Sequence, residues 1–237
     1  MDKLITHFLD MDDNRLAYCE HGQGSDLLLL HGNSQSKRIF RRYQLEHFAS
    51  FHTIAIDSPG HGESTCNNEK LCYAGCCDAA CCLCEKLGIT DCSIIGYSDG
   101  ANIALLMATT APRLVKKAVL LSPNYRVSGL TPAIINIIRI CERILGFLSR
   151  LGLNTGKAAK RMGMMLEDVP TSEKELCALE TDITILYAEH DVVRPAHLQR
   201  LASLIPNASL MRIDGCRHMT ILNHHRAIDR IKNAVCS

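Results

Sequence analysis

The chain has 237 residues, with 26 lysines and arginines against 25 aspartates and glutamates, and 47% of its residues are apolar. Because nucleic acids and anionic membranes select proteins with a concentrated basic surplus, this balance predicts that neither is the main partner. No apolar run reaches the ~18 residues of a membrane span, and the charged N-terminal segment lacks the core of a signal peptide. We therefore expect a cytoplasmic protein, while the oligomeric state stays open.

The predicted strands begin with two segments, 4–9 and 15–20, on either side of a turn around Asp12-Asp13-Asn14. They are suited to an antiparallel hairpin at the edge of a sheet. Segment 209–213 is predicted as the last strand. The strands between are short apolar runs that end at turn residues; they are 27–30, 53–56, 93–95, 118–121 and 183–187. Since these runs lack the alternation of a half-exposed strand, they indicate parallel strands that are buried on both faces.

Helical patterns lie between these strands, at 36–49, 71–88, 99–111, 194–205 and 220–235. The alternation of strands and helices predicts an α/β fold in which about eight strands, most of them parallel, form one sheet with helices on both faces. The chain contains no internal repeat and no low-complexity linker. We therefore expect a single domain over residues 1–237.

Residues 124–180 interrupt this alternation and form an apolar insertion with a helical pattern. Because the insertion leaves from the end of a strand, where α/β proteins bind their ligands, we interpret it as a short helical cap over the site. Ile134 and Ile138, in its most apolar part, are candidates for substrate contacts. The alternative is an additional helical layer without a functional role.

Gly96-Tyr97-Ser98-Asp99-Gly100 fits the pattern Gly-x-Ser-x-Gly and lies between a predicted strand and a predicted helix. In this context the serine occupies a strained turn that projects its hydroxyl group. Gly96 and Gly100 remove side chains that would clash where the strand and the helix approach each other. We therefore predict that Ser98 is a catalytic nucleophile.

A serine nucleophile needs a general base and a carboxylate, and in this architecture they follow the serine in the order Ser, Asp, His. Asp191 comes after the strand 183–187 and His218 after the last strand, so we predict Asp191 as the acid and His218 as the base. Glu189 is the main alternative to Asp191. The other acids and histidines of this region are Asp182, Asp214, His224 and His225. We expect the two neighbouring histidines to lie within the helix 220–235.

The oxyanion that forms during acyl transfer needs hydrogen-bond donors, and the loop after strand 27–30 supplies one. His31-Gly32-Asn33-Ser34 can turn sharply at Gly32, and we predict that the backbone N–H groups of Asn33 and Asp99 form the oxyanion hole. The carboxylate of Asp99 has two interpretations. It could bind a substrate ammonium group, or it could stabilise the N-terminus of the following helix.

Together these motifs resemble the α/β-hydrolase family over nearly the full chain. His31-Gly32-Asn33 is similar to the family's His-Gly-x loop, and Asp57-Ser58-Pro59-Gly60-His61-Gly62-Glu63-Ser64 is close to its Asp-x-x-Gly-x-Gly-x-Ser segment. Among its members, the chain resembles the small serine esterases and amino-acid-ester hydrolases. The resemblance implies Ser98, Asp191 and His218 as the catalytic triad, a helical cap, and no metal or organic cofactor.

The 13 cysteines are the unusual feature of the composition, and six of them fall in the predicted helix 71–88. Most of these six share its apolar side, which favours packing as small apolar side chains. Cys77, Cys81 and Cys84 form a stripe whose ends are too far apart to share one metal ion, and redox or metal chemistry is the alternative. Without an export signal we expect free thiols, with Cys82 the most exposed.

The leading functional hypothesis is a serine hydrolase that cleaves a small, hydrophobic ester, thioester or activated amide through an acyl-enzyme intermediate. The same residues also support hydrolysis of C–C, lactone or peptide bonds. A protein that binds a ligand in the same pocket with little turnover is the alternative from another functional class. A thiol-based redox or metal protein is a third.

Overall fold

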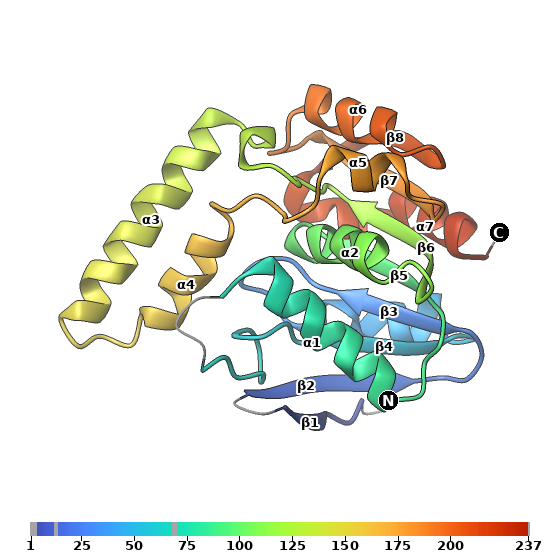
Figure 1. The fold of residues 1–237 in the computed structure, drawn as a ribbon, viewed down its shortest axis with the longest axis horizontal. Helices are drawn as coiled ribbons and strands as arrows, with labels where there is room; N and C mark the ends of the chain where they lie inside the picture. The colour runs from blue at the N-terminus through green and yellow to red at the C-terminus, as the bar shows by residue number, and fades with distance from the viewer. Residues whose placement is uncertain (1–3, 12–13, 68–70, 237) are drawn as a thin grey trace.

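The computed structural model describes residues 4–11, 14–67 and 71–236, and within them eight strands form one sheet (Figure 1). In chain order the strands are β1 (His7–Met11), β2 (Asn14–His21), β3 (Asp26–Leu30), β4 (His52–Ile56), β5 (Cys92–Tyr97), β6 (Val115–Leu121), β7 (Asp182–His190) and β8 (Ala208–Arg217). Their spatial order is β1-β2-β4-β3-β5-β6-β7-β8. The predicted α/β architecture is confirmed.

Only the first two strands run antiparallel to their neighbours. β1 pairs with β2 and β2 with β4 in antiparallel fashion, and every later pair is parallel. The N-terminal pair therefore forms the predicted hairpin with β1 at the edge of the sheet. The turn was predicted around Asp12-Asp13-Asn14, and Asp12 and Asp13 lie outside the described residues.

Alternate side chains of each central strand enter two separate cores. Leu28 and Leu30 belong to a cluster with the helices α1, α2 and α6, while Leu27 and Leu29 belong to a cluster with α7. Both faces of the sheet are therefore dry, which explains why these runs are uniformly apolar. The bounds of these helices are α1 Tyr73–Lys86, α2 Asp99–Thr110, α6 Pro195–Leu204 and α7 His225–Cys236.

The segment predicted as a helix at 36–49 folds differently. It forms a 3₁₀ turn, η1 (Lys37–Phe40), and a wider π-type turn, η2 (Tyr43–His47). Phe40 and Tyr43 of this segment are buried, and two tertiary hydrogen bonds hold the wider turn. The Tyr43 hydroxyl donates to Leu222 O at 2.7 Å, and the Gln44 amide donates to Cys19 O at 3.1 Å.

The insertion between β6 and β7 is helical, as predicted, and projects from the body of the molecule (Figure 1). Its elements are η3 (Val127–Gly129), α3 (Pro132–Arg150), α4 (Gly156–Met164) and α5 (Glu173–Cys177). Ile138, Met164 and Leu176 from this insertion belong to the same buried cluster as the sheet. We propose on this basis that the insertion and the sheet form one domain. No helix in the three described ranges is both long and apolar enough to cross a bilayer.

The cysteines of α1 mostly pack against the sheet. Cys76, Cys77 and Cys84 are buried in the cluster that contains Leu28 and Leu30. All 13 cysteines are free thiols. The prediction that Cys82 is the most exposed thiol is wrong, because Cys82 is half-buried whereas Cys177 and Cys236 are exposed. Both exposed thiols lie at the C-terminal end of a helix, where fewer neighbouring residues cover them.

A buried ion cluster joins the chain after β4 to η1. The Asp57 carboxylate accepts hydrogen bonds from the Lys37 ammonium at 2.7 Å, the Lys37 backbone N–H at 2.6 Å and the Glu63 backbone N–H at 2.8 Å. Lys37 is only 3% exposed, and its second ionic partner is Glu63 at 2.6 Å. Asp57 thus holds the loop 57–64 and the segment after the strand β3 together.

Replacing Asp57 with alanine is expected to destabilise the protein by about 3 kcal/mol. Removing one partner of a buried ion pair typically costs ~3–5 kcal/mol, and the remaining Glu63 partner favours the lower end of that range. Urea unfolding of Asp57→Ala measures the change. The matched control is Asp91→Ala, which breaks an exposed pair with Lys116 and should cost less than about 1 kcal/mol. Equal losses in both variants would contradict the buried-cluster argument.

Candidate active site

Ser98 lies at the sharp turn between β5 and α2, with a backbone φ of 54°. The turn is possible because neighbouring positions lack side chains. A Cβ atom at Gly100 would lie 2.1 Å from Leu30 O, and one at Gly96 would lie 2.4 Å from Gly100 O. The strained turn predicted from the motif is thus present, and it places Ser98 at the first turn of a helix, where unpaired backbone N–H groups gather.

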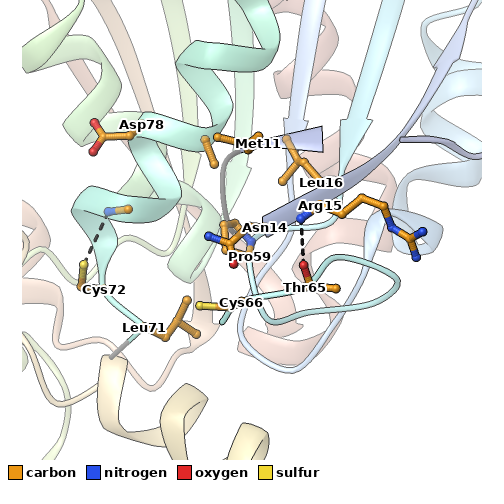
Figure 2. A pocket seen from close by; sticks show the side chains of 12 residues that line it. Met11, Asn14, Arg15, Leu16, Pro59, Thr65, Cys66, Leu71, Cys72 and Asp78 are labelled. Atoms are coloured by element: carbon orange, nitrogen blue, oxygen red, sulfur yellow. Dashed lines mark hydrogen bonds between the residues drawn. The ribbon is translucent and has the colours of Figure 1, made fainter. Parts of the chain in front are cut away.

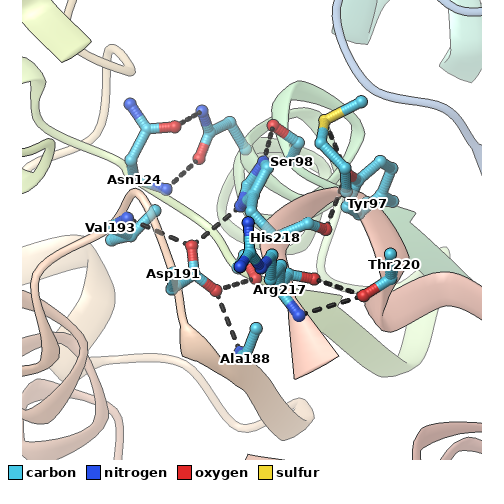
Figure 3. A network of polar contacts seen from close by, with 12 residues as sticks. Tyr97, Ser98, Asn124, Ala188, Asp191, Val193, Arg217, His218 and Thr220 are labelled. Carbon is cyan, nitrogen blue, oxygen red and sulfur yellow. Dashed lines mark hydrogen bonds and ion pairs between the residues drawn. The ribbon is translucent and has the colours of Figure 1, made fainter. Parts of the chain in front are cut away.

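Ser98, His218 and Asp191 form a continuous hydrogen-bonded chain (Figure 3). The Nε2 atom of His218 lies 3.2 Å from Ser98 Oγ, and its Nδ1 atom lies 2.8 Å from Asp191 Oδ1. The C-terminal ends of β7 and β8 explain the contact between Asp191 and His218. Both strands run further than predicted, and His190 pairs with Arg217, so that Asp191 and His218 follow side by side.

The Asp191 carboxylate is held by three further donors. Its Oδ2 atom accepts from the Ser122 hydroxyl at 2.5 Å and from Ala188 N–H at 2.9 Å, while Oδ1 also accepts from Val193 N–H at 3.1 Å. Burial alone raises the pKa of Asp191, but the hydrogen bond and the charge of His218, together with these donors, outweigh it and lower the pKa below its usual value. The site therefore favours an ionised carboxylate next to the imidazole.

The alternative acids lie elsewhere. Glu189, the main alternative, accepts a hydrogen bond from Gly215 N–H at 2.8 Å. Asp182 is the first residue of β7, at the opposite end of the strand from Asp191. Asp214 is exposed and forms an ion pair with Arg212. Among these acids, Asp191 is the one that the structure brings to His218.

The neighbouring histidines are not both helical. His225 begins α7, as predicted, but His224 precedes the helix and is its extended flanking residue. The predicted helix 220–235 is divided here, because residues His218–Asn223 form a separate 3₁₀ segment, η4, which carries His218 at its start.

Tyr97 and Ser122 are site residues that the sequence analysis missed. The Tyr97 hydroxyl donates to His218 O at 2.9 Å, and the Tyr97 ring lies 5.5 Å from the imidazole ring (Figure 3). Ser122 binds the Asp191 carboxylate from the end of β6. A signal was available for Ser122, since it is a polar residue directly after a buried strand, next to the strand that carries Asp191. No sequence signal pairs Tyr97 with a main-chain carbonyl 121 residues away.

The loop predicted to complete the oxyanion hole lies against α2. The side-chain amide of Asn33 donates to Asp99 Oδ2 at 2.9 Å and to Arg161 O of α4, also at 2.9 Å. Within the described residues, no hydrogen bond engages the backbone N–H of Asn33 or of Asp99. Both predicted donors are thus available on neighbouring segments. The structure also links the loop to the cap through Arg161.

His31 fixes the conformation of this loop. Its Nδ1 atom lies 2.7 Å from Gly32 O, and its Nε2 atom accepts a hydrogen bond from Ser58 N–H at 3.1 Å. Because a carbonyl can only accept, the contact with Gly32 assigns the proton to Nδ1. Burial lowers the pKa of His31, which keeps the ring neutral and able to accept at Nε2.

The Asp99 side chain is buried, with 2% of the residue exposed. Its Oδ1 atom accepts from the Tyr73 hydroxyl at 2.9 Å, and its Oδ2 atom accepts from Asn33. Burial raises the pKa of Asp99, and the two donors act in the opposite direction. An ammonium group would have to displace one of these donors. Recognition of an ammonium group by Asp99 stays a prediction.

The two cap residues predicted to contact substrate pack inward. Ile138 is 5% exposed and belongs to the main buried cluster, and Ile134 is partly buried against the same cluster. Their role as substrate contacts stays a prediction.

A separate cavity of about 210 Å³ lies between β2, the loop after Pro59 and the start of α1 (Figure 2). Arg15, Cys66, Leu71 and Cys72 are among its lining residues. Neither the Ser98–His218–Asp191 chain nor the oxyanion loop contributes to its wall, so this cavity is distinct from the candidate active site.

Comparisons with known proteins agree with this fold. The family model described as the alpha/beta hydrolase fold matches residues 27–137. The (E)-2-((N-methylformamido)methylene)succinate hydrolase of Acinetobacter baylyi is 31% identical over 125 residues, which cover 52% of this chain and 47% of that protein. The match thus spans about half the length of this relative. The 2-hydroxymuconate semialdehyde hydrolase of Pseudomonas putida is 23% identical over 249 residues, which cover 90% of this chain and 87% of that protein.

A solved structure extends the likeness over the whole chain. A thermophilic esterase from Thermogutta terrifontis has a TM-score of 0.79 and 20% identity, and the superposition covers 98% of this chain and 97% of the esterase. At this identity the likeness concerns the fold. Taken with the family model over residues 27–137 and with the strand order, it leads to one conclusion: the chain has the α/β-hydrolase fold.

Proposed function

We propose that this protein is a serine hydrolase that cleaves a small, apolar carboxylic ester through an acyl-enzyme intermediate. The observation that carries the proposal is the hydrogen-bonded chain from Ser98 Oγ through His218 to Asp191. A serine hydroxyl is a weak nucleophile by itself. In such a chain the imidazole accepts the hydroxyl proton, and the carboxylate holds the imidazole in the orientation that this transfer needs.

The mechanism follows from the arrangement of these groups. His218 Nε2 takes the proton from Ser98 Oγ as the oxygen attacks the ester carbonyl, and Asp191 stabilises the resulting imidazolium. The N–H groups of Asn33 and Asp99 donate hydrogen bonds to the carbonyl oxygen and stabilise the negative charge that develops on it. His218 then passes its proton to the leaving alcohol. A water molecule, deprotonated by His218, attacks the acyl group and releases the acid, which returns Ser98 to its starting state.

The choice of an ester rests on two further points. The similar proteins include an esterase, and the insertion above the site is rich in Ile, Leu and Met, which supports an apolar acyl or alcohol group. The same triad would also support hydrolysis of C–C, lactone or peptide bonds, since the fold hosts several of these reactions. The free thiols support a reducing, cytoplasmic location.

The test combines active-site labelling with a panel of substrates. We expect a fluorophosphonate probe to label the folded protein at Ser98, and p-nitrophenyl esters of graded acyl length to be hydrolysed with a preference for an apolar acyl chain. Peptide mapping of the labelled protein locates the modified residue. A folded protein that neither reacts with the probe nor hydrolyses any ester of the panel would favour the ligand-binding alternative.

A further inference from the structure

The helix α3 of the cap exposes a continuous apolar stripe to solvent. The side chains of this stripe are each 53–62% exposed; they are Ile137, Ile140, Ile144, Phe147 and Leu151. Their spacing of three and four residues in alternation keeps them on one side of the helix. The largest apolar patch of a monomeric protein often marks an interaction site. This stripe is therefore a candidate docking surface.

The rest of α3 is already packed. Ile138 is buried, and Ile134 and Ile135 pack against the main cluster, while α4 lies along the inner side of α3 (Figure 1). The apolar stripe lies on a different side of the helix, at the outer edge of the molecule. The exposed side chains are thus additional to those that hold the cap in place.

Positive charge flanks the stripe along one edge. At ~100° per residue, Arg139, Arg143 and Arg150 lie beside the stripe on the exposed surface of α3. Among the described residues, none of the three forms an ion pair. The only acidic residue within Pro132–Arg150 is Glu142, so this surface has a local positive surplus. The partner should therefore combine apolar and anionic groups.

A second copy of the chain does not meet this requirement. If two α3 helices packed along the stripe in antiparallel directions, their arginine edges would face each other. In parallel directions, the arginines of one copy would face Cys141 and Leu148 of the other. In neither arrangement does a carboxylate of one copy face the arginines of the other. A standard protein interface also takes ~20–30 residues from each partner, far more than this stripe offers.

We propose that α3 docks the protein on the surface of an anionic lipid bilayer, lying in the plane of the membrane. The stripe would enter the boundary between head groups and acyl chains, and the arginines would bind the anionic head groups. Such a helix rests on the membrane without crossing it. The composition of the whole chain hides this local positive surplus, because acidic residues elsewhere balance it. For that reason the composition predicts no membrane partner.

The test is sedimentation of the purified protein with vesicles. We expect binding to vesicles of equimolar phosphatidylcholine and phosphatidylglycerol, weaker binding at high salt, and little binding to pure phosphatidylcholine. The variant Ile140→Ser/Ile144→Ser/Phe147→Ser should lose at least about 10-fold in binding. The variant Arg139→Gln/Arg143→Gln/Arg150→Gln should lose about 5-fold for each arginine removed.

Matched controls come from other surfaces. Ile5→Ser removes an exposed isoleucine near β1, and Arg113→Gln/Arg200→Gln/Arg212→Gln removes three arginines away from α3, so both should bind like the wild type. Circular dichroism shows whether each variant is folded. Ser98→Ala should bind vesicles normally, because docking does not depend on the proposed catalysis.

Two results would overturn the proposal. One is the absence of binding to the anionic vesicles, or equal binding by the stripe variant. The other is a dimer of the wild-type protein in light scattering that the stripe variant abolishes, which would assign the face to a second copy of the chain.

Discussion

Replacing Ser98 with alanine is expected to lower kcat/KM for a p-nitrophenyl ester by roughly 10⁴- to 10⁶-fold. The variant lacks the only oxygen that lies within hydrogen-bond distance of His218 Nε2 among the described residues. It retains the oxyanion loop, so a small residual rate above that of the uncatalysed reaction should persist. Steady-state hydrolysis with the best ester of the panel measures the loss.

The interpretation of this variant depends on its fold. The strained φ of 54° is a property of the backbone at position 98, and alanine has the same Cβ as serine, so stability should change little. Ser203→Ala, on the exposed side of α6, is the matched control and should keep full activity. Activity within 10-fold of wild type in Ser98→Ala would refute the role of Ser98 as nucleophile.

Replacing Asp191 with asparagine is expected to lower kcat by about 10⁴-fold. The surroundings of the carboxylate determine how the new amide would lie. Ser122 O–H and Ala188 N–H both donate to the Oδ2 position. The carbonyl oxygen of asparagine should therefore occupy this position, because the amide NH₂ group cannot accept these hydrogen bonds. The amide NH₂ group would then face His218 Nδ1 and donate to it. The proton of the neutral imidazole would move to Nε2, which could no longer accept the proton of Ser98.

Glu189→Gln is the matched control for this experiment. Its side chain accepts one hydrogen bond from Gly215 N–H, and the carbonyl oxygen of glutamine can accept the same bond. We expect activity within about two-fold of wild type. Loss of activity in Glu189→Gln, with Asp191→Asn still active, would reverse the assignment of the acid.

Local signals were sufficient for the strands and for the serine turn. The central strands are recognisable because both faces of the sheet are covered, so that neighbours such as Leu29 and Leu30 are both apolar although they enter different cores. The serine turn is recognisable because a side chain at Gly100 would collide with the main chain of β3. In both cases the constraint acts on adjacent residues and is therefore visible in sequence.

Contacts between distant segments required the tertiary structure. The sequence left Asp191 and Glu189 as alternatives, and the pairing of His190 with Arg217 decides which of them meets His218. The bonds of Tyr97 and Ser122 to this group join segments that are far apart in the chain. The width of the turn at Tyr43–His47 likewise depends on Leu222 and Cys19.

In the cap, too, some features were visible in the sequence and others depended on the tertiary structure. The amino-acid sequence by itself predicted an apolar insertion with a helical pattern over residues 124–180, and Ile134 and Ile138 lie in its most apolar part. It did not determine that Ile138 is 5% exposed while Ile140 is 57% exposed, because isoleucines occur around much of the helix. The tertiary structure decided which side is covered, since burial depends on where α4 and the sheet pack. The same packing left the stripe and its arginines facing solvent, where composition alone had shown only a balanced charge.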